Sequence, residues 1–209
     1  MSGALGGWTM IRRDCPERLR AVGVGRALLL LALALLAPVG SAGADDRLWG
    51  LLERGGQVIL IRHAITTPGV GDPPGMRLDE CATQRNLTDE GRRDARRLGE
   101  AFRARAIPVE RVLSSAWCRC LETARLAFGS AESWAPLANL YGRPENSADQ
   151  ARQMRAAVSE RRPGGNVVMV SHGSTIVALT GVSPAPAEMV IVTPQGDGRF
   201  AVAGRLTAH

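Results

Sequence analysis

Short runs of apolar residues constrain the fold of this chain most strongly. Residues 57–62 read Gln-Val-Ile-Leu-Ile-Arg, residues 166–171 read Asn-Val-Val-Met-Val-Ser, and residues 111–114 are a shorter candidate strand. Continuous β-branched runs are typical of strands buried on both faces of a parallel sheet. Each run is followed by a helical pattern, so we predict an α/β fold with three layers, α/β/α, around a mostly parallel open sheet.

The helices are predicted between and after these strands. Thr88 caps a helix that extends to about Arg105, with Asp89 and Glu90 in its first turn. Residues 64–86 form a long loop rich in Pro and Gly, and loops of this length usually have a function or are disordered. The remaining expected elements are helices at 46–54, 117–128, 148–161 and 173–180, and closing strands at 188–193 and 199–206.

The first forty-four residues have the pattern of a secretory signal peptide. Five Arg precede the apolar run Ala27–Ala37, which is followed by the small-residue end Ala42–Ala44. This order predicts cleavage after Ala44, a periplasmic or secreted bacterial protein, and one domain over residues 45–209. Either Met1 or Met10 fits as the start. The alternative is a retained membrane anchor, but eleven apolar residues are fewer than the ~20 that a spanning helix needs.

The charge balance points to no particular partner. The formal charge is +6 and every basic residue is Arg, but removing the signal takes away five Arg and two acids and leaves +3. Few aromatic residues remain to stack on bases, so nucleic acid is not an expected partner.

Three cysteines remain after the signal, in what we expect to be an oxidising compartment. Cys118 and Cys120 are too close in sequence for the usual spacing of a zinc pair. We therefore predict one disulfide from Cys81 to either Cys118 or Cys120, with the other thiol buried and free.

Polar side chains follow the predicted strands at their carboxyl ends. The first strand ends at Arg62 and His63, the second leads to Arg119, and the third is followed by His172. In open α/β sheets the ligand crevice lies at this edge. Each residue alone has a local alternative, such as a turn histidine or a solvated arginine. Two imidazoles and two guanidiniums together favour an anion site with a nucleophile. Their charge would repel a divalent metal ion, and we predict no cofactor.

Four segments also resemble signatures of the histidine phosphatase superfamily. Residues 58–64 are similar to its first-strand motif, usually Arg-His-Gly, and residues 86–92 resemble its Leu-Thr-x-x-Gly helix start. Residues 114–124 and 170–173 match its second and third motifs, in the order of the family. The resemblance implies a phosphoglycerate mutase-like fold. The Cys-bearing second motif and a Gly-Asp-Pro-Pro-Gly loop further resemble an exported bacterial branch.

The resemblance assigns roles to individual residues. It implies that His63 attacks phosphorus and becomes a phosphohistidine, which water then hydrolyses. It further implies that Arg62 and Arg119 hold the phosphoryl oxygens and that His172 completes the pocket. Thr66 is a candidate hydroxyl donor to substrate, with a local backbone hydrogen bond as its alternative role.

Two departures from the family pattern bear on this chemistry. Ala64 replaces the usual glycine after the nucleophile. Asn139 stands where mutase-like members carry the Glu that protonates the leaving group. The candidate acids that remain are loop carboxylates, chiefly Glu145 and Asp72, with Asp79 and Glu80 as further alternatives. A missing acid favours leaving groups that need no proton, such as an aryl phosphate or phosphohistidine.

We therefore expect an exported, metal-independent phosphatase that hydrolyses a phosphomonoester, either a phosphorylated small molecule or an envelope phosphate ester. The alternative is a non-catalytic phosphate-binding envelope protein with a degenerate site. A mutase fits less well, because it requires a matching acid.

Overall fold

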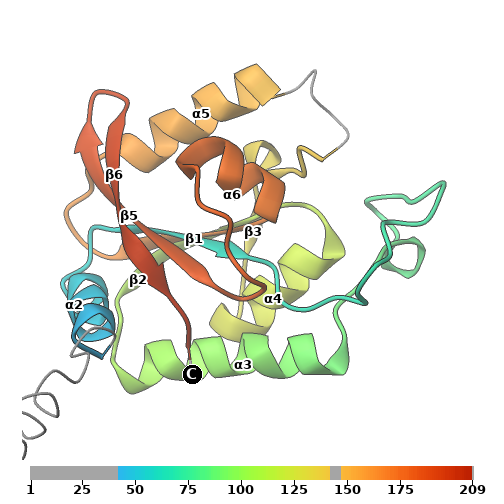
Figure 1. The fold of residues 1–209 in the computed structure, drawn as a ribbon, viewed down its shortest axis with the longest axis horizontal. Helices are drawn as coiled ribbons and strands as arrows, with labels where there is room; N and C mark the ends of the chain where they lie inside the picture. Colours follow the sequence, from blue (N-terminus) through green and yellow to red (C-terminus); the bar gives the residue numbers. More distant parts are fainter. Residues whose placement is uncertain (1–41, 142–146, 209) are drawn as a thin grey trace, which may run out of the picture. The chain divides into compact units, whose positions relative to one another are not determined.

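The computed structural model describes residues 42–141 and 147–208, and a six-stranded sheet of order β3-β2-β4-β1-β5-β6 forms its centre (Figure 1). The strands are β1 (Val58–Arg62), β2 (Val109–Ser114), β3 (Glu132–Ser133), β4 (Asn166–Ser171), β5 (Met189–Gly196) and β6 (Arg199–Leu206). The helices are α2 (Ala42–Glu53), α3 (Asp89–Ala104), α4 (Cys118–Phe128), α5 (Ser147–Ser159) and α6 (Gly173–Thr180), with short 3-10 turns η1 (Cys81–Thr83) and η2 (Ala135–Leu137).

The sheet is mostly parallel, as predicted. β3, β2, β4 and β1 pair in parallel, whereas β5 runs antiparallel to β1 and β6 runs antiparallel to β5. Arg62 at the end of β1 lies opposite Ser171 at the end of β4, and Ser114 at the end of β2 lies opposite Val170. The carboxyl ends of these three strands therefore meet at one edge of the sheet.

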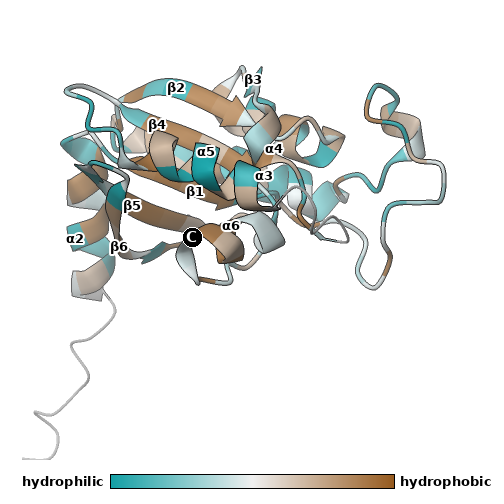
Figure 2. Ribbon diagram, turned by 90° about the horizontal axis from the view of Figure 1, so that it is seen from above, coloured by the Kyte–Doolittle hydropathy of each residue, from teal (hydrophilic) through white to brown (hydrophobic). Residues whose placement is uncertain are grey.

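Helices cover both faces of the sheet, which confirms the predicted α/β/α layers (Figures 1 and 2). Alternate side chains of β1 point to opposite faces. Ile59 and Ile61 are buried in one apolar cluster with residues of α2, α3 and α4, and Val58 and Leu60 are buried in a second cluster with residues of α5 and α6. This double burial explains why β1 is apolar without polar alternation.

The start of α3 is fixed against the segment that follows β1. The Thr88 hydroxyl accepts a hydrogen bond from the Gly91 amide at 3.1 Å, and the Thr88 amide donates to the Ile65 carbonyl at 3.0 Å. A Cβ atom at Gly91 would lie 2.2 Å from the Ile65 carbonyl oxygen. The glycine of the Leu-Thr-x-x-Gly motif therefore allows the helix to approach the backbone behind the predicted nucleophile.

Some boundaries differ from those predicted. α2 begins at Ala42 rather than at residue 46, and β5 extends to Gly196 beyond the expected end at 193. β3 was not predicted, because a pair of residues, Glu132 and Ser133, is too short to show an alternating pattern.

Most of the predicted signal peptide, residues 1–41, lies outside the described residues. The predicted cleavage position after Ala44 falls in the first turn of α2. Among the helices within residues 42–141 and 147–208, none has the length and apolar character to cross a membrane.

Candidate active site

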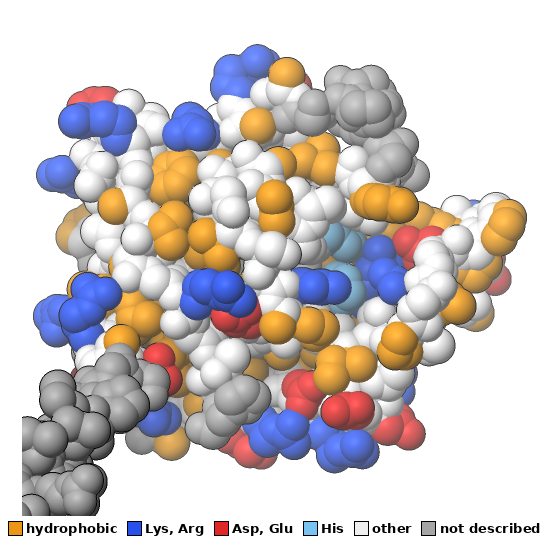
Figure 3. Space-filling view, viewed as in Figure 1, with side chains coloured by type: hydrophobic (Ala, Val, Ile, Leu, Met, Phe, Trp, Pro, Cys, Tyr) orange, Lys and Arg blue, Asp and Glu red, His pale blue; other side chains and the backbone are white. Residues whose placement is uncertain are grey.

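The carboxyl ends of β1, β2 and β4 border a cleft of about 950 Å³. Its walls include Arg62, His63, Arg119 and His172, so the four side chains predicted at this edge surround one cavity. In Figure 3 the two imidazoles of the described histidines lie in a hollow bordered by guanidinium groups. Folding thus brings together residues that are up to 110 positions apart in the sequence.

Hydrogen bonds fix the segment that carries the predicted nucleophile. The His63 amide donates to the Ser171 carbonyl at 2.9 Å, which extends the pairing of β1 with β4. The Ala64 amide donates to the Thr123 hydroxyl at 3.0 Å, and that hydroxyl donates to the Arg119 carbonyl at 2.7 Å. The second motif, on α4, therefore holds the backbone next to the first.

The alanine that replaces the usual glycine is accommodated. Ala64 is fully buried. It is not among the described non-glycine residues with positive φ, which are Ala106, Ala187 and Asp197. The backbone at this position does not need glycine, and the extra methyl group packs in a small cluster with Leu87 and Ala95.

The imidazole of His63 is neutral and has a defined tautomer. Its side chain is buried, and Nδ1 lies 2.9 Å from the Ala64 carbonyl oxygen. Because a carbonyl oxygen only accepts hydrogen bonds, Nδ1 carries the proton and Nε2 carries the lone pair. Burial, with the positive charges of Arg119 and Arg62, lowers the pKa of His63 to about 3. The ring is therefore unprotonated at neutral pH, as a nucleophile requires.

His172 is the second neutral imidazole of the cleft. Its Nε2 lies 2.8 Å from the Ser115 hydroxyl and 3.5 Å from the Cys120 sulfur. Its ring packs edge-on against His63, with centroids 5.5 Å apart, and against Trp117. Burial and the nearby guanidinium charges hold its pKa well below the ordinary value. His172 therefore enters the cleft as a hydrogen-bonding group of fixed orientation.

The arginines of the cleft have donors without partners. Within residues 42–141 and 147–208, four buried side-chain polar atoms have no hydrogen-bond partner, and three of them are the Nε atoms of Arg62, Arg85 and Arg119. A second nitrogen of Arg62 donates to the Pro184 carbonyl at 2.9 Å, which fixes its side chain. Buried donors normally find acceptors. These three therefore point to an anionic ligand with several oxygens.

Asp72, a candidate general acid, is an ion-pair partner in this structure. Its carboxylate accepts hydrogen bonds from Arg119 at 2.7 and 3.1 Å, from the Trp117 indole at 3.2 Å and from the Arg85 amide at 3.1 Å. Burial alone would raise the pKa of the Asp72 carboxyl, but the hydrogen bonds from Arg119, Arg85 and Trp117 outweigh it and hold the pKa below its ordinary value. Asp72 is therefore ionised at neutral pH and has no proton to give.

Arg85 is a cleft residue that the sequence argument missed. It lines the cavity beside Asp72, and its guanidinium donates to the Val70 carbonyl at 2.8 Å. Burial, together with the charges of Arg119 and Arg62, lowers the pKa of Arg85. The available signal was its place directly before the motif at residues 86–92 and three residues before the Thr88 cap, but the spacing gave no indication that this side chain faces inward.

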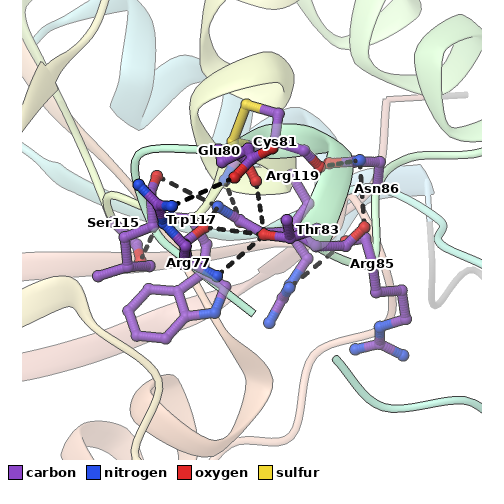
Figure 4. Close-up of a disulfide and its surroundings, with 12 residues drawn as sticks. Arg77, Glu80, Cys81, Thr83, Arg85, Asn86, Ser115, Trp117 and Arg119 are labelled. Carbon is purple, nitrogen blue, oxygen red and sulfur yellow. Dashed lines mark hydrogen bonds and ion pairs between the residues drawn. A yellow bond between two sulfur atoms is a disulfide. The ribbon is translucent and has the colours of Figure 1, made fainter. Parts of the chain in front are cut away.

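The disulfide links Cys81 to Cys118 and leaves Cys120 free and buried, so one of the two predicted pairings is confirmed. The bridge ties the long loop to the first turn of α4, next to Arg119. Figure 4 shows the guanidinium groups of Arg85 and Arg119 on the side away from the sulfur atoms. Burial raises the pKa of the Cys120 thiol to about 12, so this thiol is not a reactive nucleophile.

Thr66 and Glu145 are the two remaining candidates. Thr66 is buried, pairs with Leu87 in an isolated antiparallel bridge and does not line the cavity. The structure therefore does not place Thr66 at the wall of the cleft, and its backbone instead joins the segment after β1 to the residues before α3. Glu145 lies outside the described residues.

The position of the expected general acid carries an amide. Asn139 lines the cleft, and its side-chain oxygen accepts hydrogen bonds from the Ser174 hydroxyl at 2.8 Å and from the Tyr141 amide at 3.1 Å. An amide has no proton to transfer. With Asp72 ionised, no carboxyl group among the described cleft residues is set up to protonate a leaving group.

The charge of the cleft suits a phosphate ester. Three guanidiniums and one carboxylate line it, and both imidazoles are neutral, which gives a formal charge of +2. A phosphomonoester dianion carries the complementary charge. In the described part of the chain, no group of three or more His, Cys, Asp or Glu side chains is arranged to hold a metal ion.

Comparison with known proteins agrees with this reading of the site. Residues 58–141 match the histidine phosphatase superfamily (branch 1). The matched range contains Arg62, His63, Arg85 and Arg119, and it ends before His172. No curated protein matches the chain in sequence.

Two solved structures share the fold. The product of the open reading frame Rv3214 from Mycobacterium tuberculosis is 22% identical, with 75% of this chain and 100% of that chain covered and a TM-score of 0.55. Phosphoserine phosphatase from Entamoeba histolytica, in complex with 3-phosphoglyceric acid, is 15% identical, with 72% and 96% covered and a TM-score of 0.52. The predicted phosphoglycerate mutase-like architecture is thus confirmed.

Proposed function

We propose that this chain is a phosphatase of the histidine phosphatase type, which hydrolyses a phosphomonoester without a metal ion through a phosphohistidine at His63. The superfamily match supports the phosphatase class. The observation that carries the proposal is the pairing of a neutral, buried imidazole of fixed tautomer with guanidinium Nε atoms that have no partner.

In the first step the Nε2 lone pair of His63 forms a bond to phosphorus as the bond from phosphorus to the leaving oxygen breaks. The leaving oxygen keeps the electron pair and takes a proton from solvent. Charge on the three equatorial oxygens is stabilised by Arg62, Arg119 and Arg85, whose positions are set before the reaction. His172 lies across the ring of His63 and contributes a fixed hydrogen-bonding group.

In the second step a water oxygen attacks phosphorus and the nitrogen–phosphorus bond breaks. The electron pair returns to Nε2 of His63, and the proton lost by the water passes to solvent or stays on inorganic phosphate. The Ala64 carbonyl holds the Nδ1 proton throughout, so the ring returns in the tautomer that starts the next cycle.

The residues that line the cleft favour a substrate whose leaving group needs no proton. Asn139 and the ionised Asp72 leave the first step without a carboxylic acid, and a general acid typically contributes 10²–10⁴-fold. We therefore propose an aryl phosphate as a better substrate and an alkyl phosphate as a slow one. A phosphohistidine is the other candidate, and there the bond from phosphorus to the substrate's ring nitrogen would break and that nitrogen would keep the electron pair. Rates across phosphate esters of rising leaving-group pKa test this: a steep fall is expected, and a flat series contradicts it.

The same lack of an acid favours a second candidate, a protein that binds phosphate without turnover. One experiment separates the two. The purified protein is assayed with an aryl phosphate in the presence of a chelator, beside His63→Ala and the exposed loop variant Asp79→Asn. Turnover that His63→Ala abolishes and Asp79→Asn keeps supports the phosphatase. Phosphate binding without turnover supports the second candidate.

We also propose that the protein is exported and acts on a phosphorylated small molecule or an envelope phosphate ester. The basic head, the apolar run Ala27–Ala37 and the small residues up to Ala44 support export. N-terminal sequencing of the protein from its native host is expected to give Asp45 as the first residue. A chain that begins at Met1 or Met10 contradicts the proposal.

A further inference from the structure

The long loop between β1 and α3 contributes one carboxylate, that of Asp72, to the cleft. The loop projects beside α4 in Figure 1, and it carries Asp72 and Arg85. Four hydrogen bonds converge on the Asp72 carboxylate from three residues: Arg119 and Trp117 at the start of α4, and Arg85, through its amide, at the end of the loop. Every other described carboxylate of this loop pairs on the surface; Asp79, for example, pairs with Arg77.

The contact with Arg119 occupies one edge of the guanidinium. Nη1 and Nη2 donate to the two carboxylate oxygens at 2.7 and 3.1 Å, the bidentate arrangement that fits the planar fork. The Arg119 side chain is 1% exposed, and its Nε has no partner. The ion pair thus occupies Nη1 and Nη2, and Nε remains available for another acceptor.

We propose that Asp72 is a positioning residue: its bidentate contact orients Arg119 so that the remaining edge of the guanidinium meets the phosphoryl group. This inference deepens the proposed function, on which it rests. A buried guanidinium needs a compensating partner in the empty site, and a carboxylate with four donors is held rigidly enough to provide one. The loop therefore completes the site by fixing the orientation of the Arg119 guanidinium, and it supplies no proton.

Two other roles for Asp72 make different predictions. A general acid would have to be protonated, but the Asp72 carboxylate accepts hydrogen bonds from all four of its donors. A gate that competes with phosphate would weaken anion binding, so its removal would improve binding. A positioning carboxylate acts only through Arg119.

A double-mutant cycle on turnover of an aryl phosphate separates these roles. Asp72→Asn is expected to lower kcat/KM by about 100-fold in the wild-type background, since misplacement of a catalytic group costs this much. In an Arg119→Ala background the same substitution is expected to have little further effect. Asp72→Glu should recover part of the loss, and the control Asp79→Asn should have none.

The proposal is overturned if Asp72→Asn lowers kcat/KM equally in the wild-type and Arg119→Ala backgrounds, or if it raises kcat/KM. A loss of kcat/KM that grows with the pKa of the leaving group also overturns it, in favour of a general acid.

Calorimetric titration with inorganic phosphate makes the test independent of turnover. The affinity for phosphate should fall by about ten-fold in Asp72→Asn, which corresponds to the loss of one charge-assisted hydrogen bond. Binding without turnover in the wild type would reject the phosphatase alone, whereas unchanged or tighter phosphate binding in Asp72→Asn would reject the positioning role.

Discussion

The Nδ1 atom of His63 lies 2.9 Å from the carbonyl oxygen of Ala64, the residue that follows it in the chain. This contact assigns the ring proton to Nδ1, so Nε2 carries the lone pair that acts as nucleophile. Ala64 is the residue that departs from the usual Arg-His-Gly signature, yet the group that sets the tautomer is its backbone carbonyl. The departure therefore leaves the chemistry of the nucleophile intact.

We expect the free energy of unfolding to fall as the pH decreases through the window from 6.5 to about 3. Burial, with the charges of Arg119 and Arg62, lowers the pKa of His63 to about 3 in the folded state. Between these values the unfolded chain binds a proton that the folded chain does not, so acid favours unfolding. The lowered pKa of His172 acts in the same direction.

Urea denaturation at about pH 7 and about pH 5 checks this linkage. The wild type should lose more stability between the two pH values than His63→Asn, which has no group titrating there at position 63. The comparison uses the change with pH, so an overall destabilisation of the variant does not affect it. Equal changes in both proteins would contradict the buried, neutral state of His63.

We expect Arg119→Lys to lower kcat/KM by about 100-fold to 1000-fold, the loss seen when one preorganised donor to a transition-state oxygen is removed. A lysine keeps the charge but has no planar fork, so it cannot bind Asp72 through two nitrogens and present a third to phosphate. Steady-state kinetics with an aryl phosphate give the value. The matched control is Arg77→Lys on the exposed loop, and near-wild-type activity of Arg119→Lys would count against the role of the guanidinium.

The first motif could be predicted from the sequence because neighbouring residues determine its structure. A buried strand such as β1 shows as a continuous apolar run, and the residues that follow it must lie at the carboxyl edge of the sheet. The Thr88 cap and the nearby Gly91 mark the start of α3 in the same way. Fold class, layers and the four cleft residues follow from patterns of this kind.

The contacts of the long loop could not be read in the same way. Its residues have no period, and their partners are set by tertiary packing: Asp72 pairs with Arg119, 47 positions away. The same cause explains why Arg85 was missed and why Thr66 was placed in the cleft although it pairs with Leu87. The choice of Cys118 over Cys120 likewise depends on which side of α4 faces the loop.

We expect the Cys81–Cys118 bridge to stabilise the fold by about 4 kcal/mol, the loop-entropy value for a closed loop of this size. The sequence separation of the pair is 37 residues. Denaturation with and without reductant measures the contribution. Wild type and Cys120→Ala should both lose stability on reduction, and the double variant Cys81→Ser/Cys118→Ser should not respond.

Peptide mapping of the oxidised protein supplies the outcome that would refute this pairing. A bridge between Cys81 and Cys120, or no difference on reduction, would mean that the loop is not tied to the first turn of α4 through Cys118.

We expect Gly91→Ala to destabilise the protein by about 1–3 kcal/mol, as overpacking does. Its new Cβ would lie 2.2 Å from the Ile65 carbonyl oxygen, and a backbone atom cannot move aside cheaply. Gly50→Ala is the matched helical control, since its Cβ would meet only the flexible end of Arg54 at 3.5 Å. Thermal denaturation of the two variants should show a loss for Gly91→Ala and none for Gly50→Ala; similar values would show that α3 does not closely contact the segment after β1.

The most direct test of the central claim is to trap the phosphoenzyme. The protein is mixed rapidly with an aryl phosphate, quenched in alkali, which preserves phosphohistidine, and digested for mass spectrometry. The account predicts one added phosphoryl group on the peptide that carries His63, stable in alkali, labile in acid and absent from His63→Ala. A phosphoryl group on another residue, or turnover with no phosphoenzyme at His63, would contradict it.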